Sequence, residues 1–426
     1  MIIYTVKEGD TLFSIAERNN TAVSRIAADN RIDPEIPLVV GQTLVLLYPE
    51  EIYTAKEGDT VLSIARLFNT SAVKIWQNNP ILEGKNSVFP GQTIVISYGA
   101  PELSEKSIGG YGYTYIDDDL LRRTLPYMTY LSVFPYGLTE SGELISPAGD
   151  GRLIRTAKEY NTVPLLSLTS LTEEGVFSSP LVDSILSNEA LRQRVIENTA
   201  NAVFSKGFGG VDMDFEFIDP SLAEEYALFI EELKNALGEG FVVFADLAPK
   251  TYRTQPGLLY EAHDYPLLGE SADKLFLMTY EWGYMYGPPL AVSPIENVRS
   301  VIEYAVSEIP PEKLFMGIPS YGYDWPLPFV QGVTRAETLS SEEAVDLARR
   351  EGATIRYDES FMAPYFYYVK DSVQHVAWFQ DARSVDALAR LAEEYSLDGI
   401  NVWNIMRRFP NLWQVLLSLF PIKKVI

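Results

Sequence analysis

Short apolar runs alternate with amphipathic helical patterns over the last three quarters of the chain. Between the runs, apolar residues recur at helical spacing, for example over 181–205 and 222–237. Strands that alternate with helices favour a parallel sheet covered by helices, and eight such units predict a (β/α)8 TIM barrel over residues 109–426. The eight runs with the length and composition of buried strands are 111–115, 129–135, 164–168, 210–217, 242–247, 274–280, 314–319 and 399–403.

The fourth run carries acidic residues in strict alternation with apolar ones. In a strand, Asp212, Asp214 and Glu216 lie on one face and the apolar residues lie on the other. An unpaired buried carboxylate costs on the order of several kcal/mol, so these three are paired, solvated on an edge strand, or functional. Repulsion between neighbouring carboxylates raises the pKa of one of them and keeps it protonated. Glu216, at the downstream end, is therefore a candidate general acid.

Other chemistry-bearing residues also stand where predicted strands end. Tyr280 and Glu281 end the sixth strand, and Trp403 ends the eighth. Because TIM barrels place their active sites at the carboxyl ends of the strands, we expect these side chains to share a cleft with Glu216. Residues 332–378 fit no strand–helix unit, and their aromatic residues predict a small α+β insertion that is rich in strands. This insertion either forms a wall of the cleft or only packs its own core.

Composition narrows the classes of function. The 426 residues include no cysteine and two histidines, so disulfides and thiolate metal sites are excluded. A site made of carboxylates alone stays open, but we expect no metal and no cofactor. The net charge of −24 argues against a nucleic-acid partner. The first residues lack the basic start and long apolar core of a secretory signal, so we expect synthesis without a signal peptide and no membrane span.

The first hundred residues contain a duplication. Residues 4–16 recur as 53–65, and residues 40–45 recur as 90–95. Each copy reads strand, helix, helix, strand. The pattern predicts two small βααβ modules, residues 1–48 and 51–98, and the turn-forming residues after them predict a linker at 99–108.

Both copies resemble the LysM module over nearly their whole length. The resemblance rests on Tyr-x-Val-Lys-x-Gly-Asp-Thr, a central Asn and a terminal Gly-Gln, and it implies binding of N-acetylglucosamine polymers such as peptidoglycan and chitin. The groove would lie between the Gly-Asp-Thr turn and the loop after the Asn. The alternative is that these residues only cap helices and shape turns. They are Gly9, Asp10, Thr11 and Asn30 in the first copy and Gly58, Asp59, Thr60 and Asn79 in the second.

The acidic strand resembles the signature strand of family 18 glycoside hydrolases. Residues 277–281 are similar to that family's Met-x-Tyr-Asp, and Trp403 matches its tryptophan at the last strand. Two positions depart from the pattern. Gly209 stands where the family has its first Asp, and Glu281 stands where it has an Asp after the tyrosine.

This resemblance implies substrate-assisted retaining hydrolysis without a cofactor. Glu216 would protonate the glycosidic oxygen while the 2-acetamido carbonyl of the sugar attacks the anomeric carbon. Asp214 would hold the acetamido N–H with Asp212 behind it, and Tyr280 would bind the acetamido carbonyl. Trp403 would form the floor beneath the sugar. The spacing of the acids alone leaves a direct carboxylate nucleophile open.

Further segments resemble the spore cortex-lytic N-acetylglucosaminidases of endospore-forming bacteria. They include residues 248–251, 260–265, 321–325 and 378–384. This resemblance implies cortex peptidoglycan as the substrate and a place in the spore coat or cortex. We also expect His263 and Asp264 to form a structural pair. A chitinase and a catalytically silent glycan-binding coat protein are the alternatives, and the presence of Glu216, Asp214 and Tyr280 argues against the silent protein. The further candidates for substrate binding are Glu281, Trp282, Tyr323, Asp324 and Trp378.

Overall fold

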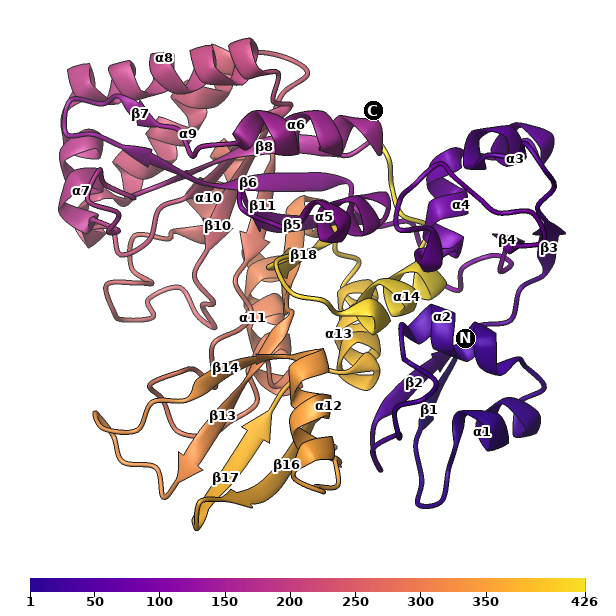
Figure 1. Cartoon of the computed structure of the whole chain (residues 1–426). Coiled ribbons are helices and arrows are strands. Elements are labelled where there is room, and N and C mark those ends of the chain that lie inside the picture. Colours follow the sequence, from indigo (N-terminus) through magenta and orange to yellow (C-terminus); the bar gives the residue numbers. More distant parts are fainter. Residues whose placement is uncertain (426) are drawn as a thin grey trace.

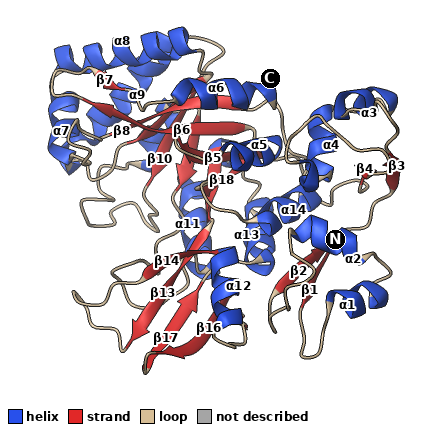
Figure 2. Ribbon diagram, viewed as in Figure 1, coloured by secondary structure: helices blue, strands red, loops and turns tan. Residues whose placement is uncertain are grey.

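Eight parallel strands close into a barrel in the computed structural model, which describes residues 1–425 (Figures 1 and 2). Strand β5 pairs with β18 on one side and with β6 on the other, which completes the ring. The predicted TIM-barrel fold is confirmed. The barrel strands are β5 (Ser107–Tyr113), β6 (Tyr130–Leu138), β8 (Val163–Thr169), β9 (Gly210–Asp214), β10 (Val242–Leu247), β11 (Lys274–Leu277), β12 (Leu314–Pro319) and β18 (Gly399–Trp403).

Helices surround the barrel and bury their apolar faces against it. The predicted helix over 181–205 is two helices, because the Asn188 side chain accepts a hydrogen bond from the amide of Leu191 and starts a new helix there. Within residues 1–425, no helix is both long enough and apolar enough to cross a membrane. The barrel helices are α5 (Asp118–Thr124), α6 (Asp150–Glu159), α7 (Ser179–Ser187), α8 (Glu189–Lys206), α9 (Ala223–Leu237), α10 (Tyr265–Ser271), α11 (Ile295–Glu308), α13 (Ala382–Glu394) and α14 (Pro410–Leu419).

The duplicated segments have the predicted order of strand, helix, helix and strand. In each copy the two strands pair in antiparallel fashion, and a threonine caps the first helix. Module 1 consists of β1 (Ile2–Thr5), α1 (Leu12–Arg18), α2 (Val23–Asn30) and β2 (Thr43–Leu46), and module 2 consists of β3 (Glu51–Thr54), α3 (Val61–Leu67), α4 (Ala72–Asn78) and β4 (Thr93–Ser97).

Both modules are docked on the barrel domain rather than tethered to it. Module 1 lies beside α13 and α14, and module 2 lies beside the end of α5 (Figure 1). The amide of Ile355 donates to the carbonyl of Val40 at 2.9 Å, and the hydroxyl of Tyr160 donates to the carbonyl of Gly84 at 2.7 Å. Main-chain groups of both modules are thus bonded to the barrel domain.

The segment predicted as a linker, residues 99–108, is also fixed. The amide of Leu103 donates to the carbonyl of Leu419, and Lys106 forms an ion pair with Glu393 of α13 at 2.8 Å. Strand β5 already begins at Ser107. The predicted connection between module 2 and the barrel is therefore a fixed segment, and turn-forming composition does not report the contacts that it makes with distant helices.

The insertion begins earlier than the predicted residue 332. Strand β13 (Tyr321–Leu327) pairs with β17 (Val373–Trp378), so it belongs to the insertion and not to the barrel. Five antiparallel strands make up its sheet, and α12 (Ser341–Arg350) packs on one face. The remaining strands are β14 (Glu337–Ser340), β15 (Arg356–Asp358) and β16 (Ala363–Lys370).

Candidate active site

The acidic strand points its carboxylates into the barrel. Asp212 is fully buried, and its carboxylate accepts a hydrogen bond from the hydroxyl of Ser132 on β6. Strand β9 ends at Asp214, and Glu216 follows two residues later, beyond the sheet. The acidic residues thus form a row that runs from the barrel interior to the carboxyl ends of the strands, where the predicted cleft lies.

A further buried carboxylate lies next to this row of acidic residues. Asp246 on β10 accepts hydrogen bonds from the hydroxyl of Tyr111 on β5, at 2.9 and 2.8 Å to its two oxygens. Burial, and then the nearby charges of Asp212 and Asp214, raise the pKa of Asp246 well above its ordinary value. Burial also raises the pKa of Asp212, so this pair of buried carboxyl groups favours protonation.

Burial and mutual repulsion favour protonated carboxyl groups at this site. Burial, and then the nearby charges of Glu216 and Asp212, raise the pKa of Asp214 well above its ordinary value. Burial also raises the pKa of Glu216. Asp214 Oδ1 has no hydrogen-bond partner among the described residues. The cluster therefore holds protons at pH values where isolated carboxyl groups have lost them, as a general acid requires.

Tyr280 and Trp403 complete the centre of the site. Burial and the nearby carboxylates of Asp246 and Asp214 raise the pKa of Tyr280, so its hydroxyl stays protonated and can donate. The ring of Trp403 lies 5.2 Å, centroid to centroid, from the rings of both Tyr111 and Phe134. Trp403 therefore lies on the aromatic layer at the centre of the barrel, where the sequence predicted the floor of the cleft.

The insertion contributes one face to the same region. The hydroxyl of Tyr323 donates to Glu281 Oε1 at 2.9 Å. Trp378 stacks on Tyr365 at 4.6 Å and belongs to an apolar cluster that touches both Tyr280 and Trp403. One face of the insertion therefore contacts Tyr280 and Trp403, and the other face packs against α12.

Asp324 is not available to a substrate. It lies on the opposite face of β13 from Tyr323 and is 4% exposed. The hydroxyl of Tyr368 donates to its carboxylate, and His375 Nδ1 lies 3.1 Å from it. The prediction of a substrate-binding role is wrong for Asp324, because neighbouring residues of a strand face opposite sides and only Tyr323 faces the cleft.

Trp282 lies beside the acidic cluster rather than in it. Its side chain lines a surface hollow of about 590 Å³ together with Tyr252 and Tyr260. Neither Glu216 nor Asp214 lines this hollow. Its predicted contact with substrate stays a prediction.

Sequence reasoning missed three residues of the site, which are Tyr111, Ser132 and Asp246. Asp246 had a detectable signal, because it is the one acid in an apolar strand. It lies two residues after Phe244 and therefore on the same inward face of the strand. Ser132 and Tyr111 resemble ordinary residues of buried strands. Only the closure of the barrel brings them to the acids.

Gly209, the departure from the family pattern, is set by packing. A Cβ atom at this position would stand 2.3 Å from Val163 Cγ1. A larger residue would require Val163 to move, so a carboxylate does not fit here.

The residues predicted to bind glycan in the modules have structural roles. The side chains of Thr11 and Thr60 cap the first helices, and Asp10 and Asp59 each accept hydrogen bonds from a tyrosine hydroxyl and a lysine amide. Gly9 and Gly58 have φ angles of 79° and 84°, which favour glycine. The geometry supports the alternative interpretation for these turn residues, whose contact with glycan stays a prediction.

Asn30 and Asn79 are buried, and their side chains join the second helix of each module to its last strand by hydrogen bonds. The Asn79 amide nitrogen donates to the carbonyls of Ile75 and Val95, and its oxygen accepts from the amide of Val95. Asn30 makes the same three hydrogen bonds in module 1. Direct contact between glycan and these two side chains is therefore a wrong prediction, because all their polar atoms are used inside the module.

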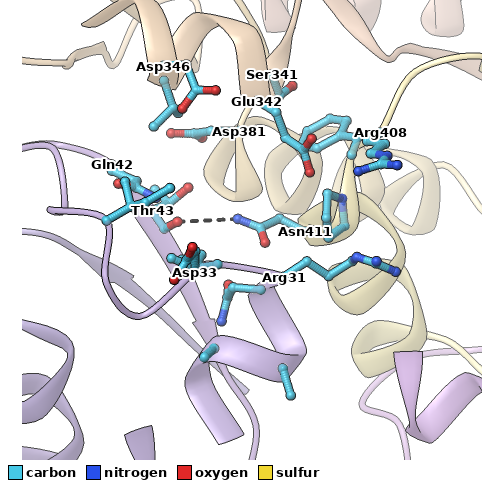
Figure 3. Close-up of a pocket in the computed structure, with 18 of the residues that line it drawn as sticks. Arg31, Asp33, Gln42, Thr43, Ser341, Glu342, Asp346, Asp381, Arg408 and Asn411 are labelled. Carbon is cyan, nitrogen blue, oxygen red and sulfur yellow. Dashed lines mark hydrogen bonds between the residues drawn. The ribbon is translucent and has the colours of Figure 1, made fainter. Parts of the chain in front are cut away.

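A large cavity of about 680 Å³ lies between module 1, the insertion and α14 (Figure 3). Arg31 and Asp33 reach it from module 1 and Glu342 from α12, while the amide of Asn411 donates to the carbonyl of Thr43 at 3.3 Å. None of the acidic residues of β9 lines it. This cavity lies where module 1 docks on the barrel domain, and it is separate from the acidic cluster.

No group of three or more histidine and acidic side chains is placed to hold a metal ion within residues 1–425.

His263 lies beneath the end of β9 and does not pair with Asp264. Its Nδ1 accepts a hydrogen bond from the amide of Ala248 at 2.8 Å, so Nε2 carries the proton and donates to the carbonyl of Phe215 at 3.0 Å. The Asp264 side chain instead caps α10. The predicted pair is wrong, because the two neighbouring side chains serve different elements.

We expect the contribution of His263 to the stability of the fold to fall as pH drops below about 6.5. Burial lowers the pKa of His263 to about 4, whereas an unfolded histidine titrates near about 6.5. Between these values the unfolded chain binds a proton that the folded chain does not, so His263 destabilises the fold by up to about 3 kcal/mol at the acid end. Urea unfolding of the wild type and of His263→Gln between pH 7 and 4 measures this effect. The variant should lose less stability with falling pH, and equal losses would contradict the assignment.

The barrel, its insertion, and the acidic strand with Tyr280 and Trp403 define a glycoside hydrolase, and the sequence comparisons give the family. The chain belongs to the family described as Glycosyl hydrolases family 18, whose pattern matches residues 152–407. Residues 4–46 and 53–97 match the LysM domain. Both resemblances drawn from the motifs are confirmed.

Named relatives cover the whole chain. It is 36% identical over 431 residues to the cortical fragment-lytic enzyme of Bacillus anthracis, with 99% of each chain covered. It is 38% identical over 434 residues to the cortical fragment-lytic enzyme of Bacillus subtilis (strain 168), covering 100% of this chain and 99% of that one. The crystal structure of the Bacillus cereus spore cortex-lytic enzyme SleL superposes with a TM-score of 0.84 at 34% identity, covering 99% of this chain and 98% of that one.

Proposed function

We propose that this glycoside hydrolase is an N-acetylglucosaminidase that acts by substrate-assisted retaining hydrolysis. The observation that carries the proposal is Asp214, which lies beside Glu216 with a buried Oδ1 that has no hydrogen-bond partner among the described residues and with a pKa that desolvation and the neighbouring carboxyl groups raise. A carboxylate nucleophile must be ionised, whereas a hydrogen-bond partner for an acetamido group need not be. The site therefore suits a reaction in which the nucleophile comes from the sugar.

The proposed steps follow from the positions of the side chains. Glu216, beyond the end of β9, protonates the glycosidic oxygen as the 2-acetamido carbonyl of the substrate attacks the anomeric carbon. Asp214 orients the acetamido group, and the hydroxyl of Tyr280 binds its carbonyl. Glu216 then removes a proton from the water that opens the oxazolinium ion. Trp403 provides the apolar surface under the sugar ring.

The proposed substrate is the peptidoglycan of the bacterial spore cortex. This choice is supported by the names of the full-length relatives, which are cortical fragment-lytic enzymes, and by the two LysM domains. The proposed location is accordingly the coat or cortex of a spore. Chitin is the alternative polymer, since it shares the N-acetylglucosamine unit that the site would recognise.

Release of soluble fragments from purified cortex peptidoglycan and from chitin tests the substrate. We expect the wild type to release fragments from cortex peptidoglycan faster than from chitin. Faster release from chitin would favour the chitinase alternative, and release from neither polymer would contradict the proposed activity.

The two modules differ in the loop that follows their second helix. Val39 of module 1 and Phe89 of module 2 occupy corresponding positions, but Val39 is 5% exposed and packs in the core of the insertion. Phe89 is 73% exposed. Module 1 thus uses this loop to dock on the insertion, and module 2 leaves it free. We infer that module 2 provides the main contact with glycan.

Replacing Phe89 with Ser should weaken binding to insoluble peptidoglycan by about tenfold, because burial of an aromatic side chain contributes at least about 1.5 kcal/mol. Hydrolysis of soluble fragments should not change. Sedimentation of the variant with the polymer measures binding. Leu67→Ser is the matched control, since Leu67 is 64% exposed at the far end of α3 in the same module. Equal binding by both variants and the wild type would refute this role of Phe89.

A further inference from the structure

We propose that His263 is a positioning residue for Glu216, which it holds through the main-chain carbonyl of Phe215. The proposal rests on the proposed role of Glu216 as general acid. Phe215 is the link between Asp214 and Glu216, so a bond to its carbonyl fixes the backbone from which the acid projects.

The acid needs such a support because it lies outside the sheet. The last pairing of β9 with β8 joins Asp214 to Thr169, and the last pairing with β10 joins Met213 to Ala245. The backbone then turns sharply, since Phe217 has a φ of 56°. The strand ladder therefore does not determine where the Glu216 carboxyl stands.

His263 is itself held firmly by the segment that follows β10. Its carbonyl accepts a hydrogen bond from Lys250 Nζ at 3.0 Å, in addition to the bond between its Nδ1 and the amide of Ala248. The hydroxyl of Tyr265 donates to the carbonyl of Ala248 at 2.7 Å and accepts from the amide of Lys250 at 3.1 Å. The imidazole is 1% exposed, and its orientation and tautomer are both fixed by this network.

Aromatic packing completes the connection. The ring of Tyr226 on α9 lies 6.0 Å from the imidazole of His263 and 6.0 Å from the ring of Phe215, with which it stacks. The end of β10, the start of α10 and α9 thus converge on the residue next to the acid. His263 provides the side-chain hydrogen bond that joins this group to the carbonyl of Phe215.

The two hydrogen bonds of the imidazole can be removed one at a time. In His263→Asn, the amide can still accept from Ala248 but cannot reach Phe215. In His263→Gln, the longer side chain can still donate to the carbonyl of Phe215. Each variant loses one buried hydrogen bond, so the two are matched in stability cost.

We expect kcat on cortex peptidoglycan to fall by about ten- to a hundredfold in His263→Asn and by less than about threefold in His263→Gln, with KM nearly unchanged in both. A role in stability alone would give equal kcat values in the two folded variants, and this result would overturn the proposal. If the wild type itself shows no hydrolysis, the proposed function fails instead, so the two failures are distinguishable.

Histidine NMR of the wild type tests the same contact without any variant at His263. The chain has two histidines, and His375→Gln assigns their signals. We expect His263 to be neutral at pH 6 with its proton on Nε2. A proton on Nδ1 would remove the donor to Phe215 and would overturn the proposal even if both variants failed to fold.

Discussion

Glu216→Gln should lose nearly all hydrolysis of peptidoglycan and keep its affinity for the polymer. A glutamine has the shape of the acid but no proton to give to the leaving oxygen, and general acids contribute about 10²- to 10⁴-fold to rates. Burial raises the pKa of Glu216, so the wild type retains that proton at a pH where an exposed glutamate has lost it. The modules that are proposed to bind polymer are not altered by the change.

Reducing-end release measures the activity of Glu216→Gln, and sedimentation with insoluble peptidoglycan measures its binding. Glu224→Gln is a matched control, because Glu224 is exposed on the outer helix α9 and undergoes the same substitution. The control should have wild-type activity. Full activity in Glu216→Gln would remove this residue from the mechanism, whatever family the chain belongs to.

Asp214→Asn should reduce kcat by at least about 100-fold. Asp214 is half-buried between Asp212 and Glu216, and its buried Oδ1 has no partner among the described residues. An empty acceptor at this place is suited to the acetamido N–H of the substrate. Asparagine keeps the size of the side chain, but its NH2 group is a donor and cannot accept a hydrogen bond from the acetamido N–H.

Steady-state kinetics on soluble cortex fragments test this second change. Asp371→Asn is the control, because Asp371 is exposed in a turn with a φ of 50° that asparagine tolerates. A kcat within a few-fold of the wild type in Asp214→Asn would show that the acetamido group does not depend on Asp214. It would then favour a mechanism without substrate assistance.

Local patterns in the sequence were sufficient to predict the barrel and the central acids. Alternation of period two reports the face of a strand directly, which is why the sequence alone places Asp212 and Asp214 on the same inward face. The carboxyl ends of the strands then bring Tyr280 and Trp403 to the same region. These are consequences of backbone geometry, which neighbouring residues determine.

Roles that depend on long-range contacts could not be predicted in the same way. Asn30 and Asn79 resemble surface residues of a binding loop, and only the structure shows that each bridges a helix and a strand. Asp324 is adjacent to a cleft residue in sequence and faces away from the cleft in space. His263 lies 48 residues from the carbonyl to which it donates. Hydrogen-bond partners at such separations leave no local periodic signal.

The most direct test of the proposed activity is mass spectrometry of cortex peptidoglycan digested by the wild type. Hydrolysis by an N-acetylglucosaminidase leaves fragments whose new reducing end is N-acetylglucosamine, and we expect this product. The product should be absent from a parallel digest with Glu216→Gln. A new reducing end on muramic acid, or the same products from the variant, would contradict the proposed activity.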